Sequence, residues 1–139
     1  MRQATTILSI TTLRRGLLEI SGEVSSWLEA QAVDTGLLTL FCRHTSAALL
    51  IQENAAAEVR ADLEAFFERL VPEQADLYTH NDEGSDDMPA HIRTALTQVQ
   101  LAVPVMEGRL VLGTWQGIYL FEHRRRRRVR EIAVHLIGK

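Results

Sequence analysis

Two histidines, His80 and His91, enclose an acidic stretch of the chain. The residues between them include four carboxylates, those of Asp82, Glu83, Asp86 and Asp87. Imidazole nitrogens are common ligands of zinc and other divalent metals, and nearby carboxylates complete or orient such sites. The stretch lacks the spacing of an EF-hand calcium loop. It therefore predicts a divalent metal site with His80 and His91 as ligands, to which the carboxylates, Asp87 among them, supply a further ligand or hold the histidines in place. The alternative is a solvated acidic loop beside a helix.

A second polar group follows the apolar residues 37–42. His44, Thr45 and Ser46 place an imidazole next to two hydroxyls, and Glu53 follows a few residues later. Such a histidine can serve as a general base or as a third metal ligand. Ser46 and Glu53 would then have catalytic roles, and Thr45 would bind substrate. The alternative is a strand end whose hydroxyls satisfy the loop backbone.

A third group lies near the C-terminus, where residues 113–117 read Gly-Thr-Trp-Gln-Gly. Glycines inside a strand mark a bulge or the close approach of another group. Strand periodicity puts Gln116, Glu122 and Arg124 on one face and Trp115 on the other. Buried amide, carboxylate and guanidinium groups need partners, which a ligand would supply, although Trp115 also fits an ordinary core.

Residues 124–128 are five consecutive arginines, and Arg130 follows them. Residues 1–123 carry 8 arginines and 17 acids, a charge of −9, whereas residues 124–139 carry +6, for a net charge of −3. A phosphate or pyrophosphate site, with Arg124 and a later arginine such as Arg130 as ligands, is one interpretation. A solvated turn is the second. Nucleic-acid binding is not expected, because the rest of the chain is acidic.

The 139 residues are 46% hydrophobic and 24% charged, which is typical of one globular domain. The only cysteine, Cys42, excludes an internal disulfide and a zinc finger, and its apolar neighbours favour a buried, inert thiol. No apolar run is long enough for a transmembrane helix, and the first residues do not resemble a signal peptide. A cytoplasmic protein without membrane partners is expected.

The elements that must position these groups alternate irregularly between strand and helix periodicity. Strands are expected over residues 4–12, 17–20, 36–42, 101–106, 109–121 and 129–137, and helices over residues 21–32, 55–70 and 89–99. Residues 47–51 fit either type, and residues 73–87 are expected to form a long loop. Ser21 and Asn54 are the expected helix caps. This order predicts a single-domain α+β fold over residues 1–139, a mostly antiparallel sheet or sandwich with two to three helices on one side.

The motifs at residues 44–49, 53–54, 80–91, 113–117 and 122–124 occur in an order that resembles the YjbQ-like family, also described as secondary thiamine-phosphate synthase enzymes. The resemblance covers residues 5–138. It implies a small α+β domain that assembles as a homotrimer, and a polar histidine pocket that holds a metal or anion in some members. The pocket residues it implies are His44, Ser46, Glu53, His80, Asp87, His91, Gln116, Glu122 and Arg124.

The leading hypothesis is therefore an enzyme that couples a hydroxymethylpyrimidine pyrophosphate to a thiazole phosphate and releases pyrophosphate. A divalent metal, Zn or Mg, would be held by His80 and His91, with His44 as the third ligand, and no organic cofactor is expected. The alternatives are a trimeric metal- or anion-binding protein with incidental synthase activity, and a hydrolase of a small phosphorylated metabolite.

Overall fold

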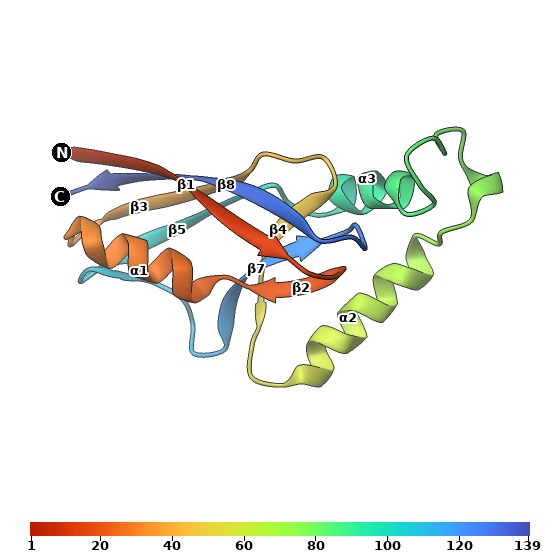
Figure 1. Cartoon of the computed structure of the whole chain (residues 1–139). Coiled ribbons are helices and arrows are strands. Elements are labelled where there is room, and N and C mark those ends of the chain that lie inside the picture. The colour runs from red at the N-terminus through yellow and green to blue at the C-terminus, as the bar shows by residue number, and fades with distance from the viewer.

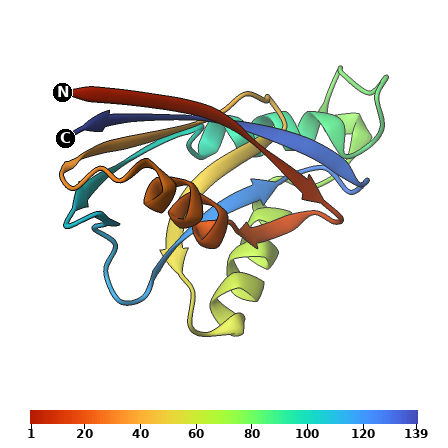
Figure 2. The same ribbon diagram turned by 60° about the vertical axis from the view of Figure 1, so that its left-hand side comes forward.

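The computed structural model describes residues 1–139, whose strands form two antiparallel sheets (Figures 1 and 2). The five-stranded sheet has the order β1-β8-β3-β5-β6 and the three-stranded sheet the order β2-β7-β4. Their bounds are β1 (Arg2–Thr12), β2 (Gly16–Glu19), β3 (Gly36–Cys42), β4 (Ala47–Glu53), β5 (Gln100–Met106), β6 (Arg109–Leu110), β7 (Gln116–Glu122) and β8 (Arg128–Gly138). The α-helices are α1 (Ser21–Gln31), α2 (Ala57–Leu70) and α3 (Asp87–Leu96). The expected α+β class is confirmed, and no helix is long and apolar enough to cross a membrane.

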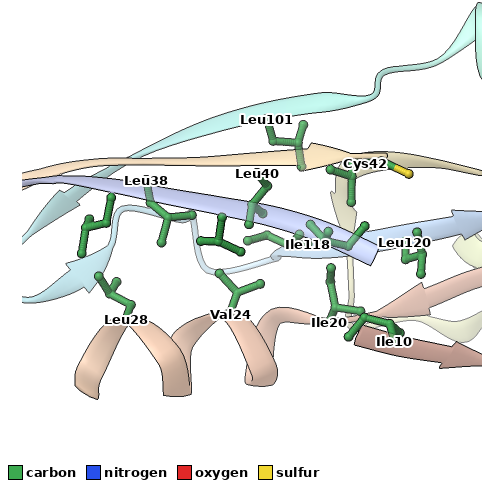
Figure 3. Packing of buried hydrophobic residues seen from close by; sticks show 14 of the residues in the cluster. Ile10, Ile20, Val24, Leu28, Leu38, Leu40, Cys42, Leu101, Ile118 and Leu120 are labelled. Carbon is green, nitrogen blue, oxygen red and sulfur yellow. The ribbon is translucent and has the colours of Figure 1, made fainter. Parts of the chain in front are cut away.

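The main core lies between the five-stranded sheet and the layer formed by α1 and β7 (Figure 3). Alternate residues of β3, such as Leu38 and Leu40, point into it because successive strand side chains face opposite ways. Val24 and Leu28 meet them from one face of α1, and Ile118 comes from β7. The apolar periodicities in the sequence thus mark the residues that meet in this core.

Strand β7 is buried on both faces, which explains its nearly continuous apolar sequence. Ile118 and Leu120 join the main core, whereas Tyr119 and Phe121 face a smaller cluster under α2. The rings of Phe121 and Phe67 of α2 meet edge to face, with centroids 5.2 Å apart. The strand therefore holds the polar residues at its ends in fixed positions between two packed layers.

The single strand predicted over residues 109–121 is divided in the structure. Arg109 and Leu110 extend the five-stranded sheet, while residues 116–122 belong to the three-stranded one. Between them the chain leaves the first sheet, and the side-chain oxygen of Gln116 accepts a hydrogen bond from the backbone N–H of Gly113 at 2.8 Å. The glycines and polar residues at 113–117 therefore mark a crossing between sheets, which periodicity alone does not reveal.

The polar residues expected to cap helices have other partners. Ser21 is the first residue of α1, and its hydroxyl accepts a bond from the Ile118 N–H. Helix α2 begins at Ala57, and the Asn54 side chain donates to Glu19 instead. Helix α3 begins at Asp87, two residues before the expected Pro89. The 73–87 loop also contains a short 3-10 helix, η1 (Ala75–Leu77).

Candidate functional site

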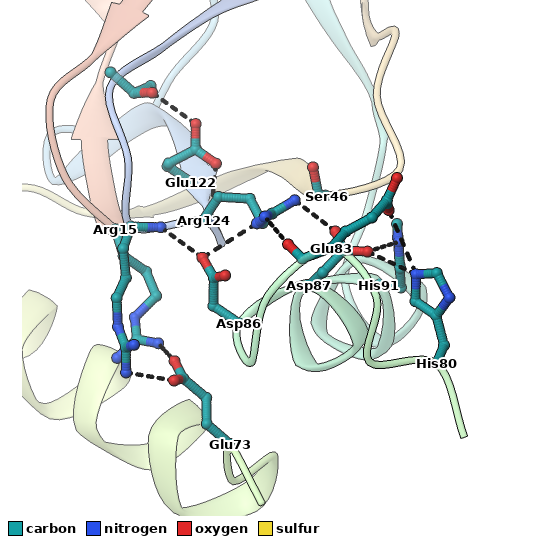
Figure 4. A network of polar contacts seen from close by, with 12 residues as sticks. Arg15, Ser46, Glu73, His80, Glu83, Asp86, Asp87, His91, Glu122 and Arg124 are labelled. Carbon is teal, nitrogen blue, oxygen red and sulfur yellow. Dashed lines mark hydrogen bonds and ion pairs between the residues drawn. The ribbon is translucent and has the colours of Figure 1, made fainter. Parts of the chain in front are cut away.

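The acidic loop and the start of α3 bring two histidines and two carboxylates together (Figure 4). One ligand atom from each of His80, Glu83, Asp87 and His91 lies within 4.8 Å of the others. Asp87 Oδ2 is the centre of this cluster, at 2.8 Å from His80 Nε2 and 3.1 Å from His91 Nε2. Asp87 and His91 are four residues apart on α3, so both side chains lie on one helix face. We call these four residues the histidine–carboxylate cluster.

Arg124, in the loop after β7, holds the acidic loop against the sheets. Its Nη1 donates to Asp87 Oδ1 at 2.6 Å, its Nε to Asp86 Oδ2 at 3.1 Å, and its Nη2 to the Glu83 carbonyl at 2.9 Å. Asp87 thus has one oxygen fixed by Arg124 and the other turned toward the two imidazoles. Its side chain is 2% exposed. Arg124 therefore positions the central carboxylate of the cluster.

The charges of the cluster are mutually stabilised. The hydrogen bond to Asp87 raises the pKa of His80, although the imidazole is exposed to solvent. Burial alone would raise the pKa of Asp87, but the hydrogen bond from His80 and the nearby charge of Arg124 leave it below its usual range. The contact between His80 and Asp87 thus favours the charged form of each group.

The geometry of His91 fits a metal ligand. Its Nδ1 lies 2.8 Å from the carbonyl oxygen of Thr45, which only accepts, so Nδ1 carries a hydrogen. In the neutral ring this leaves the Nε2 lone pair facing the acceptor oxygen of Asp87, an arrangement that a shared cation stabilises. A backbone carbonyl on the second ring nitrogen is the usual way of orienting a metal-bound histidine. The donor set of two imidazoles and two carboxylates suits zinc, manganese or iron better than magnesium.

His44 is not brought into this cluster, contrary to its predicted role as a third ligand. Its Nε2 accepts a hydrogen bond from the Glu131 N–H at 2.8 Å, which uses the lone pair that a metal would need. Burial, followed by the charge of Arg130, lowers the pKa of His44 and so disfavours the protonated ring. Glu83 and Asp87, and not His44, are the further candidate ligands beside His80 and His91.

Glu122 and Arg130 form a buried ion pair that joins the two sheets. Arg130 Nε donates to Glu122 Oε1 at 2.7 Å, and its Nη2 donates to Oε2 at 2.5 Å. The hydroxyl of Thr12 donates to Glu122 at 2.6 Å, and Ser46 accepts from Arg130 at 3.0 Å. These contacts saturate Glu122, so the structure gives it, Ser46 and much of Arg130 a structural role where a catalytic or substrate-binding one is predicted.

A groove of about 800 Å³ runs beside the cluster. It brings His91 of the cluster together with His44, Thr45, Ser46 and Arg130, which come from separate parts of the sequence. The apolar walls include Phe41 and Val99. A mixed polar and apolar lining next to metal-type ligands suits a small organic molecule.

A second cavity, of about 470 Å³, lies on the arginine side of the cluster. Its lining is wholly polar and consists of Glu83, Gly84, Ser85, Asp86, Arg124, Arg125, Arg126 and Arg128. Four arginines against two carboxylates leave this cavity positive. We call it the arginine cavity. Of the arginines in residues 124–130, four face this cavity, whereas Arg130 pairs with Glu122 and borders the groove instead.

Glu53, Trp115 and Gln116 lie at the other end of the three-stranded sheet. Glu53 pairs with Gln116 in the β4–β7 register, whereas Ala47 pairs with Glu122. Six residues of strand separate these ends by about 20 Å. The Glu53 carboxylate accepts bonds from the Ala55 and Ala56 N–H groups before α2. Within one chain these three residues do not share a site with the histidines, because strand length keeps the ends apart.

The sequence offered Glu83 and Asp86 only as two of four candidate carboxylates, and it did not single out Arg126 and Arg128 as parts of the site. A signal for Glu83 was available, because it stands three residues after His80 and four before Asp87. The roles of the arginines carried no such signal, since their loop follows no regular period.

The sequence matches the family described as UPF0047 protein YjbQ-like over residues 6–139. It is 49% identical to UPF0047 protein sll1880 of Synechocystis sp., over 99% of this chain and 94% of that protein. It is 41% identical to UPF0047 protein YjbQ of Escherichia coli O157:H7, over 95% of this chain and 96% of the relative. The solved structure of the conserved hypothetical protein TT1486 from Thermus thermophilus is similar, with a TM-score of 0.84, 34% identity and coverage of 95% and 99%. The chain therefore belongs to the YjbQ-like UPF0047 family.

Proposed function

We propose that the protein is a metal-dependent enzyme that acts on a small phosphorylated metabolite. The observation that carries the proposal is the histidine–carboxylate cluster, which stands between the arginine cavity and the 800 Å³ groove. His80, Glu83, Asp87 and His91 would hold a divalent ion, which would neutralise the oxygens of a departing phosphate group. Arginines already fixed beside such a centre stabilise the negative charge of the departing phosphate without a cost of reorganisation.

The reaction that these groups suit best is the one implied by the family resemblance. In it, the bond between the pyrimidine methylene carbon and the pyrophosphate oxygen breaks, and the electron pair leaves with pyrophosphate. The thiazole nitrogen then gives its lone pair to the methylene carbon, so that a C–N bond forms and the ring nitrogen becomes cationic. No proton is transferred and no protein nucleophile is needed. This matches a site whose buried acid, Glu122, is already saturated by Arg130.

The chain's own residues would bind and orient the reactants. Arg126 and Arg128, free of the ion pairs that hold Arg124, would take the pyrophosphate in the arginine cavity. The groove would receive the organic ring between Phe41 and Val99, with Thr45 at its polar side. Fixing both reactants in one geometry can remove about 7–11 kcal/mol from the barrier of such a displacement.

The test begins with the metal content of protein purified without chelator or histidine tag, alongside His91→Ala and a matched control, His135→Ala. His135 is half-buried on β8, bonds to Gln3 on β1, and is not a member of the cluster. We expect stoichiometric metal in the wild type and in the control, and no bound metal in His91→Ala. Pyrophosphate release is then measured with and without the thiazole phosphate.

Three outcomes separate the candidate functions. Release that requires the thiazole phosphate and is lost in His91→Ala supports the synthase reaction, and release without it supports a hydrolase. Bound metal with no turnover, and no growth rescue of a strain lacking its main thiamine-phosphate synthase, favours a metal- or anion-binding protein. Full activity in His91→Ala would exclude the cluster as the active site.

We also propose that the chain assembles as a homotrimer, through the outer face of the five-stranded sheet. No helix covers that face (Figure 1). Ile7, Ala133 and Phe41 stand in register across β1, β8 and β3, and both Ile7 and Phe41 are exposed. An apolar row of this kind on an open sheet is typical of an interface between protein chains.

A further inference from the structure

The buried guanidinium of Arg93 has no carboxylate partner. Arg93 lies on α3 and is 3% exposed. Its Nη2 donates to the Val71 carbonyl at 2.8 Å, but its Nε–H is buried and unpartnered. No ion pair in the protein includes this side chain. Buried charges in proteins are nearly always paired, so this cation is the kind of group that recruits an anion.

Arg93 lines a cavity of about 280 Å³ between α2 and the turn from β1 to β2. The other lining residues are Arg14, Arg15, Gly16, Glu64, Phe67, Glu68, Phe121 and Arg125. None of the four residues of the histidine–carboxylate cluster is among them. The cavity is thus separate from the proposed metal site, although Arg125 also borders the arginine cavity.

The outer arginines of this cavity already have partners. Arg14 faces Glu64 at 3.6 Å, Arg15 pairs with Glu68 at 3.1 Å and with Glu73, and Arg125 also pairs with Glu73. Figure 4 shows Arg15 and Glu73 on the α2 side of the polar network. These three glutamates balance three arginines, and the positive charge that remains uncompensated belongs to Arg93.

The neighbouring His123 reports the same excess of positive charge. It is fully buried, and neither ring nitrogen has a hydrogen-bond partner. Burial, and then the charges of Arg93, Arg130 and Arg15, lowers the pKa of His123 to about 3. The imidazole of His123 is therefore neutral and does not compensate the positive charge of Arg93.

We propose that this cavity binds a phosphate-sized oxyanion, either free phosphate or the phosphate of a small monoester, with Arg93 as its central ligand. The anion would accept the free Nε–H and share the outer fork of Arg15. Arginine forks match the geometry of phosphate oxygens, and the volume exceeds that of a phosphate group. The site stands apart from the proposed activity and needs no metal.

Phosphate titration of the metal-free, full-length protein, followed by ¹H–¹⁵N NMR, tests the proposal. The probes are the Arg93 Nε–H and the backbone N–H of Gly16, which lines the cavity. Inorganic phosphate is expected to shift both signals saturably. A parallel titration with glycerol phosphate distinguishes the two sources. Tighter binding of inorganic phosphate indicates the free ion, and tighter binding of glycerol phosphate indicates a monoester.

The matched variants are Arg93→Met and Arg126→Gln. Arg126 lines only the arginine cavity, so its loss is expected to leave the Gly16 titration unchanged. Arg93→Met is expected to weaken phosphate binding at Gly16 by about tenfold or more, since a buried charged contact is lost. His91→Ala is expected to leave phosphate binding at Gly16 unaltered. A negative result for the proposed enzyme activity would therefore not count against the phosphate site. If neither wild-type signal moves at millimolar phosphate, the cavity is not an anion site.

Discussion

At the scale of single residues, the partner of each ring nitrogen separates the histidines by role. His91 is fixed through Nδ1 by the Thr45 carbonyl, so Nε2 is directed at Asp87. His44 accepts a backbone N–H through Nε2 and supports β8 instead. The same residue type thus acts as a candidate ligand in one place and as a backbone acceptor in the other. The difference comes from contacts distant in sequence.

Arg124→Met is expected to weaken divalent metal binding by about 10- to 100-fold, because the variant frees Asp87 and Asp86 from their shared guanidinium. Zinc affinity measured by competition with a chromophoric chelator checks this. Arg127→Met is the control, since Arg127 contacts no member of the cluster. Equal affinities in the two variants would show that Arg124 does not position Asp87.

His123 is expected to make stability depend on pH. Its pKa is about 3 in the folded protein and near 6.5 in the unfolded chain. Below pH 6.5 the unfolded state binds a proton that the folded state does not, so the free energy of unfolding falls as the pH drops toward 3. The slope approaches about 1.4 kcal/mol per pH unit.

Urea unfolding of the wild type and of His123→Phe, between pH 7 and pH 4.5, measures this contribution. The substitution keeps a ring against Phe121 and breaks no hydrogen bond, because the His123 side chain makes none. We expect a flatter pH profile in His123→Phe. Parallel profiles would mean that His123 titrates normally in the folded protein.

At the scale of elements, the cluster depends on how β7, β8 and α3 are fixed to one another. The Glu122–Arg130 pair ties β7 of one sheet to β8 of the other, and Thr12 adds β1. The loop that follows β7 carries Arg124, which reaches the first residue of α3. The polar contacts around Arg124 therefore rest on β7, which is buried on both faces, and on β8 and β1, which are fixed to it through Glu122.

Glu122→Leu is expected to lower the free energy of unfolding by about 3–5 kcal/mol, because it leaves Arg130 buried without its partner. The double variant Glu122→Leu/Arg130→Met removes both charges and is expected to lose less than Glu122→Leu alone. Chemical denaturation of the wild type, both single variants and the double variant gives the coupling. Additive losses would contradict a shared buried pair.

At the scale of the whole molecule, apolar and aromatic side chains remain outside the core. Ile7 and Phe41 stand on the open face of the five-stranded sheet, and Trp115 is 62% exposed at the far end of β7. Trp115 and Gln116 make no contact with the histidines of their own chain. Assembly is the arrangement that would cover the sheet face and give these exposed groups partners.

Ile7→Glu is expected to shift the mass measured by light scattering from three times 15.7 kDa toward that of one chain. A charge in the middle of an apolar contact cannot be paired there, which is why the effect should be large. Glu58→Lys, on the exposed start of α2, is a control that should keep the trimer. A wild type that is monomeric at all concentrations would refute the proposal.

Much of the fold was predictable because it follows from local periodicity. Apolar residues alternate over residues 36–42, which form β3, and recur with helical spacing over residues 57–70, which form α2. Phe66 and Leu70 of that helix nevertheless stay exposed. Asp87 and His91 are four residues apart, but the helix was expected to begin at Pro89, which leaves Asp87 outside it. The division of residues 109–121 could not be predicted, because both parts have strand character and only the sheet order separates them.

The sequence by itself determined the α+β class, the family, and the presence of a loop rich in histidine and carboxylate. These depend on residue types and short spacings, which local physics governs directly. Only the tertiary structure decided that Glu122 pairs with Arg130, that His44 serves a backbone group, and that Gln116 lies about 20 Å from Glu122 at the opposite end of β7. Those outcomes depend on strand register and sheet order, which bring together residues far apart in the chain.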